Sequence, residues 1–206
     1  MSPAWPEPAS LLTLITSVRT RRSEIEAALG PAPAAGVITW VASQPTGADD
    51  VLLGHQLGPR IERIQGTTRA AWLEVVPELT TRLQHPWQQL GASERYLAGV
   101  ARCLIAGGTP CVLELPGTAL DGARLKALVA DLTARGVGVV VVERRLRLLQ
   151  ALATPSWLLD RTMVAGPVPP ESLLDHADAW SLCFGGTLAT RGEEGVGGFG
   201  PPTTPG

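Results

Sequence analysis

The strongest constraint on the fold is the alternation of helical and strand patterns between residues 93 and 143. Four apolar residues recur at helical spacing before Gly107-Gly108, and Ser93 is expected to cap their helix: Leu97, Val100, Leu104 and Ile105. The apolar run CVLEL (111–115), a second helical pattern (122–136) and the β-branched run VGVVVVE (137–143) follow. Such units are joined by right-handed crossovers, which make the strands parallel. The sequence therefore predicts an α/β fold with a mostly parallel sheet.

The rest of the chain supplies further elements and the domain boundaries. The apolar spacing of residues 11–18 predicts a helix from 9 to 29, and VITWVAS (37–43) predicts a strand. A second helical stripe is interrupted by Pro77 and comprises Trp72, Val75, Val76, Leu79 and Leu83. We expect a Pro-rich, disordered N-terminus (1–8), one domain (9–176) and a Gly/Pro-rich, disordered tail (177–206).

Composition narrows the function classes. The net charge is −2 and the pI is about 5.9, so no basic field favours a nucleic-acid partner. The 3 cysteines match neither a secreted disulfide framework nor a CxxC metal site. No apolar stretch reaches the length of a membrane span, and the N-terminus does not resemble a signal peptide. We expect a soluble, cytoplasmic protein without direct membrane insertion.

A parallel sheet binds ligands at the carboxyl ends of its strands, so the residues just after 113 and 142 are expected to line any site. These residues are Glu114, Leu115, Glu143, Arg144 and Arg145.

Residues 90–121 carry three ordered blocks that match one family. They read LGASERYLAGVARCLIAGGTPCVLELPGTALD. This segment resembles the stretch of ABC ATPases that runs from the LSGGE signature, through its helix, to the Walker B strand and the SALD D-loop. Without a gap, Leu90 falls on the first signature residue, Glu114 on the Walker B aspartate and Asp121 on the D-loop aspartate.

The resemblance continues more weakly on both sides of this segment. ITWVASQPT (38–46) resembles the Q-loop strand, with Gln44 at the family's glutamine, and residues 158–174 resemble the close of a cassette. The resemblance implies a P-loop-NTPase-like sheet with a helical subdomain around the signature. It also implies ATP and Mg²⁺ as cofactors, and as partners another ABC ATPase subunit or a membrane permease, at whose cytoplasmic face the chain would lie.

Several departures from the family pattern concern catalysis. No GxxxxGK[ST] loop exists, and by spacing Ala9 and Ser10 fall on its lysine and serine, with the preceding strand and loop absent. The segment GPAPAAG (30–36) is a weaker candidate remnant and also lacks lysine. Leu115 replaces the catalytic glutamate, and Arg144 replaces the switch histidine.

The signature is also altered, because Gly91, Ala92 and Ser93 stand where the family has Ser, Gly and Gly, followed by Glu94. The resemblance and its departures together predict a degenerate, N-terminally shortened cassette with no catalytic residue, which is regulatory or structural in an ABC transport system. Two alternatives remain open: an ATP-binding subunit that is active only with an intact partner cassette, and an interaction scaffold unrelated to transport.

Structural roles compete with these assignments. Asp121 is equally suited to cap a helix beside Gly122, and Glu114 to be a solvated carboxylate. Arg144 and Arg145 are suited to pair with Glu143. Three isolated histidines are expected to be structural or exposed rather than metal ligands: His55, His85 and His176.

Overall fold

The computed structural model describes residues 3–31, 38–42, 47, 50–61, 69–106, 110–115, 120–161 and 163–188. The strands are β1 (Leu11–Thr16), β2 (Thr39–Val41), β3 (Cys111–Glu114), β4 (Val139–Val142), β5 (Ser156–Asp160) and β6 (Met163–Val168). The helices are α1 (Arg22–Leu29), α2 (Leu53–Ile61), α3 (Arg69–Val75), α4 (Ala92–Ala106), α5 (Gly122–Ala134), α6 (Leu146–Ala151) and α7 (Ala177–Cys183). Short 3-10 turns cover Pro77–Arg82, Trp87–Gln89 and Pro170–Ser172.

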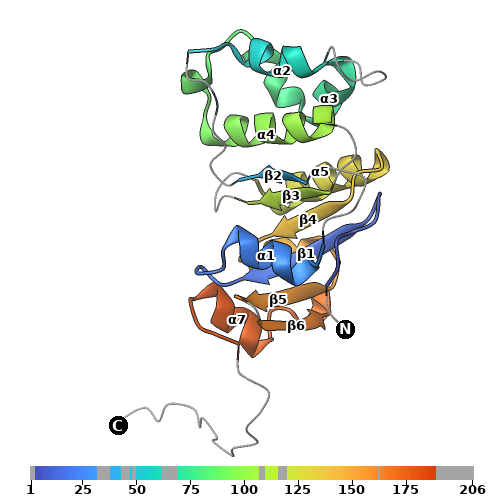
Figure 1. Cartoon of the computed structure of the whole chain (residues 1–206), viewed down its shortest axis with the longest axis vertical. Coiled ribbons are helices and arrows are strands. Elements are labelled where there is room, and N and C mark those ends of the chain that lie inside the picture. Colours follow the sequence, from blue (N-terminus) through green and yellow to red (C-terminus); the bar gives the residue numbers. More distant parts are fainter. Residues whose placement is uncertain are drawn as a thin grey trace, which may run out of the picture.

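One sheet of six strands organises the molecule, in the order β2-β3-β4-β1-β5-β6 (Figure 1). Strands β1 to β5 are mutually parallel, and β6 pairs antiparallel with β5. The predicted α/β fold with a mostly parallel sheet is therefore confirmed.

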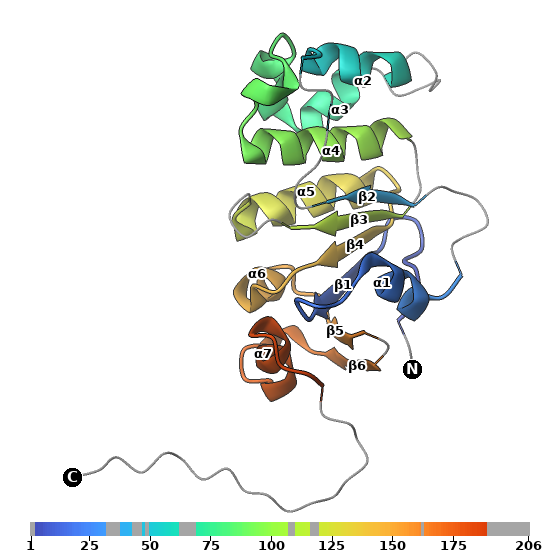
Figure 2. The same ribbon diagram turned by 60° about the vertical axis from the view of Figure 1, so that its left-hand side comes forward.

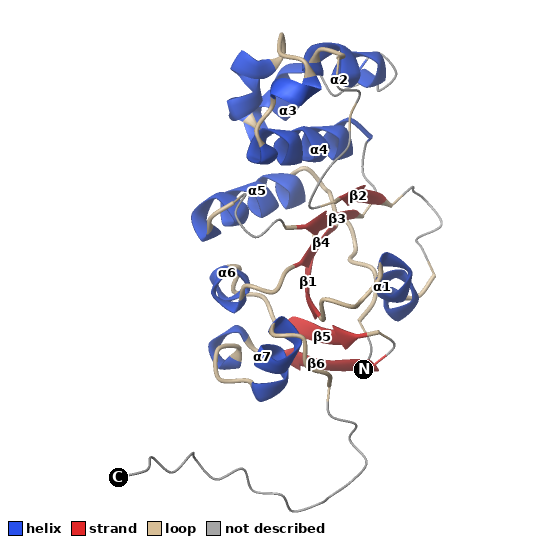
Figure 3. Ribbon diagram, turned by 90° about the vertical axis from the view of Figure 1, so that its left-hand side faces the viewer, coloured by secondary structure: helices blue, strands red, loops and turns tan. Residues whose placement is uncertain are grey.

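Helices cover both faces of this sheet. Helices α5, α6 and α7 lie on one face and α1 lies on the other (Figure 3). Side chains alternate along β1 accordingly: Ile15 belongs to the larger core and Leu14 to the smaller one beneath α1. The guanidinium of Arg22 stacks 4.4 Å above the ring of Trp40, which ties α1 to the sheet.

Beyond the β2 edge, a helical subdomain of α2, α3 and α4 extends the molecule (Figure 2). Its interior contains three fully buried aromatic residues: Trp72, Trp87 and Tyr96. Both sets of apolar residues predicted for this subdomain are buried as expected. They are the residues of the 94–106 helix and those of the stripe around Pro77. The helix begins at Ala92 rather than after Ser93, because Glu94 accepts a hydrogen bond from the backbone N–H of Gly91.

The predicted helix from 9 to 29 is wrong. Residues 11–16 form β1, at the centre of the sheet between β4 and β5, and only residues 22–29 are helical. A strand that is buried on both faces is apolar on both faces, so its pattern lacks the alternation that distinguishes strands from helices. The strand predicted to be missing from the N-terminal region is therefore present.

Both predicted disordered ends include ordered residues. Near the N-terminus, the indole Nε1–H of Trp5 donates to the carbonyl of Gly30 at 2.9 Å. At the other end, α7 lies beyond the predicted boundary at 176 and buries Ala179 and Leu182, while the N–H of Leu188 donates to Asp160. No helix among the described residues is long and apolar enough to span a membrane.

Candidate functional site

A small pocket lies where β1, β3 and β4 end. Its volume is about 140 Å³, and the polar residues around it include Ser17, Thr20, Glu114, Glu143 and Arg144. From β1 the chain leads through α1 to β2, whereas from the adjacent β4 it leads through α6 to β5, in the opposite direction. Ligands bind α/β sheets at such switch points. We therefore take this pocket as the candidate site.

The loop between β1 and α1 contains residues 17–21, SVRTR, with neither glycine nor lysine. Its Ser17 N–H donates to the Leu159 carbonyl, and its Thr20 N–H donates to the Ser17 carbonyl. The Arg19 N–H donates to Ser17 Oγ, 3.3 Å away, and Ser17 Oγ lies 3.1 Å from Thr20 Oγ1. The hydroxyls of this loop, and the amides of Ser17, Arg19 and Thr20, therefore bind groups of the protein itself.

The first turn of α1 is capped by its own carboxylate. Glu24 Oε2 accepts a hydrogen bond of 2.6 Å from the N–H of Arg21. A helix N-terminus presents unpaired N–H groups and a partial positive charge, which attract anions. Glu24 binds the Arg21 N–H at this end of α1, so this amide is not free for an incoming anion.

Glu143 directly follows β4 and is a buried carboxylate that accepts from four donors. Its Oε1 accepts from the N–H groups of Arg144 and Arg145, and its Oε2 accepts from Nε and Nη2 of Arg145, at 2.7–3.1 Å. The expected pairing is thus confirmed for Arg145. The Arg144 side chain remains exposed at the pocket.

At the end of β3, Glu114 is half-buried and Leu115 is buried. The N–H of Leu115 donates to the carbonyl of Val142, so the backbone continues the parallel ladder beyond the strand. An apolar side chain therefore follows the strand-end carboxylate, and Leu115 has no group that can accept a proton.

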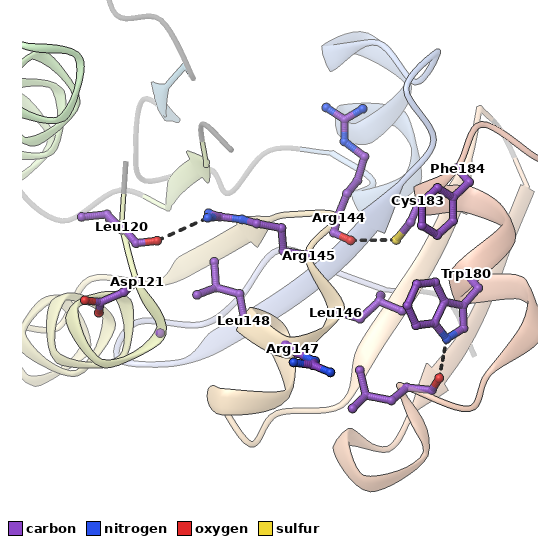
Figure 4. Close-up of a pocket in the computed structure, with 12 residues that line it drawn as sticks. Leu120, Asp121, Arg144, Arg145, Leu146, Arg147, Leu148, Trp180, Cys183 and Phe184 are labelled. Carbon is purple, nitrogen blue, oxygen red and sulfur yellow. Dashed lines mark hydrogen bonds between the residues drawn. The ribbon is translucent and has the colours of Figure 1, made fainter. Parts of the chain in front are cut away.

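A second, larger groove adjoins this pocket through Arg144, which lines both (Figure 4). Its volume is about 620 Å³, and it lies between the starts of α5 and α6 on one side and α7 on the other. Asp121 is at its rim, where its Oδ1 accepts from the N–H of Arg124 at 2.7 Å. The structure thus confirms the helix-cap role of Asp121.

The signature-like segment lies outside both cavities. Leu90 is buried, whereas Gly91, Ala92 and Ser93 are exposed at the start of α4. Burial opposes the ionisation of Glu94, but the hydrogen bond from Gly91 and the charge of Arg82 outweigh it and lower the pKa of this carboxyl. Gln44 and most of 30–36 lie outside the described residues.

Ala9 and Ser10 do not lie at the position where a phosphate would bind. They precede β1 at its amino end, and the hydroxyl of Ser10 donates to the carbonyl of Glu7. The candidate site is at the opposite, carboxyl end of β1. The correspondence between these two residues and the family's lysine and serine is therefore wrong, because it placed residues 11–15 in the helix that follows a phosphate loop.

Sequence reasoning missed Ser17 and Thr20 because they were placed within a helix. It also missed Trp180 and Phe184, which were assigned to the tail. The signal for the first pair was the β-branched content of LLTLIT, which is typical of strands. The short helix around Trp180 had no comparable signal. Among the described residues, no three His, Cys, Asp or Glu side chains gather as a metal site.

Comparisons with known proteins bear on the fold. One match is to an inward-facing ABC transporter of the metal-chelate type. The aligned part covers 86% of this chain and 79% of the transporter chain, with a TM-score of 0.62 and 18% sequence identity. A second match is to the ATP-binding subunit of an ABC transporter. The aligned part covers 78% of this chain and 80% of that subunit, with a TM-score of 0.58 and 12% sequence identity. No protein-family model and no curated protein sequence matches. The chain thus shares the fold of ABC transporter ATP-binding subunits at low identity.

Proposed function

We propose that the chain is a non-catalytic protein with the fold of an ABC ATP-binding cassette, and that it has a regulatory or structural role in an ABC transport system. The observation that carries this proposal is the β1–α1 loop. Of its five amide N–H groups, those of Ser17, Arg19, Thr20 and Arg21 donate to acceptors within the protein.

Phosphate binding at such a loop requires free, convergent N–H donors and a positive charge. Arginines of the loop and Arg144 supply positive charge here, but four of the five donors are used internally, and three carboxylates lie around the loop and the strand ends: Glu24, Glu114 and Glu143. A pocket of about 140 Å³ is also below the usual volume range of ligand sites, which begins at about 300 Å³. The used amides and the small volume do not fit the triphosphate of a nucleotide.

Hydrolysis would also need a group that orients or deprotonates the attacking water. Leu115 has no such group, and Arg144 carries a permanent positive charge at the position that the resemblance gives to the switch histidine. Both features support a role without turnover.

A role in transport would then depend on association. Gly91, Ala92 and Ser93 are exposed at the start of α4, so this segment is accessible to a second protein. In the family, the signature of one cassette faces the nucleotide bound by another. We therefore propose an intact ABC ATPase or a permease subunit as partner.

Titration calorimetry with MgATP tests the central claim. We expect no saturable heat up to millimolar nucleotide, and no phosphate release above that of buffer, for the wild type and for Leu115→Glu alike. An intact ABC ATP-binding subunit, measured in parallel, shows that the assay detects binding. A one-to-one micromolar complex with the wild-type chain would contradict the proposal.

Association is tested by affinity purification of the tagged chain from its native host, with and without a non-hydrolysable ATP analogue. We expect an ABC ATPase or permease among the proteins recovered, and its loss in Ser93→Arg. The matched control is Ala127→Arg, which places the same side chain at an exposed position of α5 and should retain the partner. Recovery of the chain alone, unaffected by Ser93→Arg, would favour a scaffold unrelated to transport.

A further inference from the structure

The groove of about 620 Å³ is larger than the strand-end pocket, and its lining is different. Its floor is formed by apolar side chains of α6 and of the segment before α7: Leu146, Leu148 and Leu174. This volume and this apolar lining are typical of small-molecule sites, which cover about 300–1,000 Å³.

Two exposed aromatic side chains form one wall of the groove. The rings of Trp180 and Phe184 are parallel, with centroids 5.5 Å apart and an interplanar angle of 2°. Trp180 is 42% exposed and Phe184 is 79% exposed, although both are large and apolar. The indole N–H of Trp180 donates to the Leu174 carbonyl, which fixes the ring against the floor. An apolar ligand that covers exposed apolar surface of this kind removes it from water, which is favourable.

Three arginines supply the positive charge of the lining, and they are not equivalent. Figure 4 shows Arg145 directed toward Leu120 and Arg144 directed away from Trp180, whereas Arg147 projects on the opposite side of α6 from Arg144. Arg145 is paired with Glu143. Arg147 is exposed and belongs to none of the ion pairs found among the described residues. The carboxylate in the lining, Asp121, already caps α5.

We propose that this groove binds an amphipathic monoanion, with its apolar body on Leu146, Leu174 and the Trp180–Phe184 wall and its carboxylate on Arg147. An apolar floor alone would accept any hydrocarbon, whereas the unpaired guanidinium selects an anionic head. A medium-chain or aryl carboxylate has this chemistry. The site requires neither nucleotide nor a protein partner, so it does not depend on the function proposed above.

The test uses octanoate as the probe and the full chain. Two-dimensional ¹H–¹⁵N NMR resolves the indole signals of the six tryptophans, and Trp180→Phe identifies the signal of Trp180 by its loss. We expect octanoate to shift the Trp180 signal selectively, with a dissociation constant on the order of millimolar, as is usual for ten non-hydrogen atoms. Butyrate, which lacks four methylenes, should bind more than about tenfold more weakly.

The head group and its partner are tested together. Octan-1-ol has the same chain without the charge and should bind about threefold to tenfold more weakly than octanoate. Arg147→Gln should weaken octanoate to the affinity of octanol and leave octanol unchanged, and Phe184→Ala should weaken both ligands. Arg135→Gln, at the far end of α5, is the matched control and should change neither.

Three results would each overturn the proposal. One is equal affinity for octanoate and octanol in the wild-type chain. Another is that the Arg147→Gln variant and the Arg135→Gln variant bind octanoate with the same affinity. The third is that the Trp180 signal shows no selective shift at an octanoate concentration about tenfold above the expected millimolar dissociation constant.

Discussion

Among single residues, Glu94 joins two parts of the helical subdomain. One carboxylate oxygen accepts the N–H of Gly91 at 2.8 Å, and the other binds Nε of Arg82. Glu94→Ala should therefore lower the free energy of unfolding by about 0.5–2 kcal/mol at pH 7, the usual cost of losing a helix cap. Urea denaturation measures this loss.

The pH dependence of this effect follows from the lowered pKa. A carboxyl whose pKa is lower in the folded state stabilises the fold above its ordinary value of 4.5, and this contribution disappears as the pH falls through the folded-state pKa. The difference between wild type and Glu94→Ala should therefore shrink below pH 4.5. Glu74→Ala, which removes a carboxylate that is 70% exposed, should cost little at any pH. A constant difference from pH 7 to pH 3 would contradict the assignment.

Cys183 is a second residue whose chemistry depends on its surroundings. Burial raises the pKa of its thiol to about 11, the nearby charges of Arg144 and Glu143 act in opposite directions, and Sγ donates to the Arg144 carbonyl at 2.8 Å. About one thiol in a thousand is then ionised at pH 8. We expect alkylation by iodoacetamide to be slow at pH 8 and to accelerate about tenfold per pH unit up to pH 10. Mass spectrometry of the labelled peptide measures the rate.

The unfolded chain provides the comparison for this labelling. In urea all three cysteines should react at similar rates, whereas in the native protein Cys103 and Cys111 are buried and should be protected throughout. Rapid labelling of Cys183 in native protein at pH 7.5 would show that the thiol is neither buried nor bound to Arg144.

At the level of elements, the sequence predicted α4, β3, α5 and β4 well. Their apolar periods are regular, and Asp121 marks the start of α5 by its own capping bond. Strand β1 was predicted wrongly, because a central strand of a parallel sheet is apolar on both faces and its spacing also fits a helix. Local periodicity cannot separate these two cases; the position between β4 and β5 depends on contacts with residues more than 120 positions away.

The prediction of a helix in place of β1 also limited how much of the candidate site could be predicted. Glu114, Glu143 and Arg144 were expected at strand ends, and the structure brings them together at the pocket. The loop from Ser17 to Arg21 was not expected at this pocket, because its residues were predicted to lie inside a helix rather than at the carboxyl end of a strand. The hydrogen bonds that occupy its amides are a property of the folded loop and have no sequence signature.

For the whole molecule, the C-terminal part of the described chain completes the core at the end opposite the helical subdomain (Figure 1). Helix α7 contacts β1 and β5, and Ala179, Leu182 and Leu188 are buried. The buried carboxylate of Asp160 accepts the N–H of Leu188. Residues 177–188 are therefore part of the domain, although their composition favours a tail.

Two truncated chains measure the contribution of this segment. A chain ending at Leu188 retains α7, whereas a chain ending at His176 exposes the β1–β5 surface beneath it and leaves Asp160 without the Leu188 donor. Burying each of two leucines contributes about 1.5–3 kcal/mol. We expect the shorter chain to lose at least about 3 kcal/mol of unfolding free energy relative to the longer one, or to fail to fold. Both chains lack residues 189–206, so thermal and urea unfolding of the pair isolates residues 177–188, and equal stability would mean that the core is complete without α7.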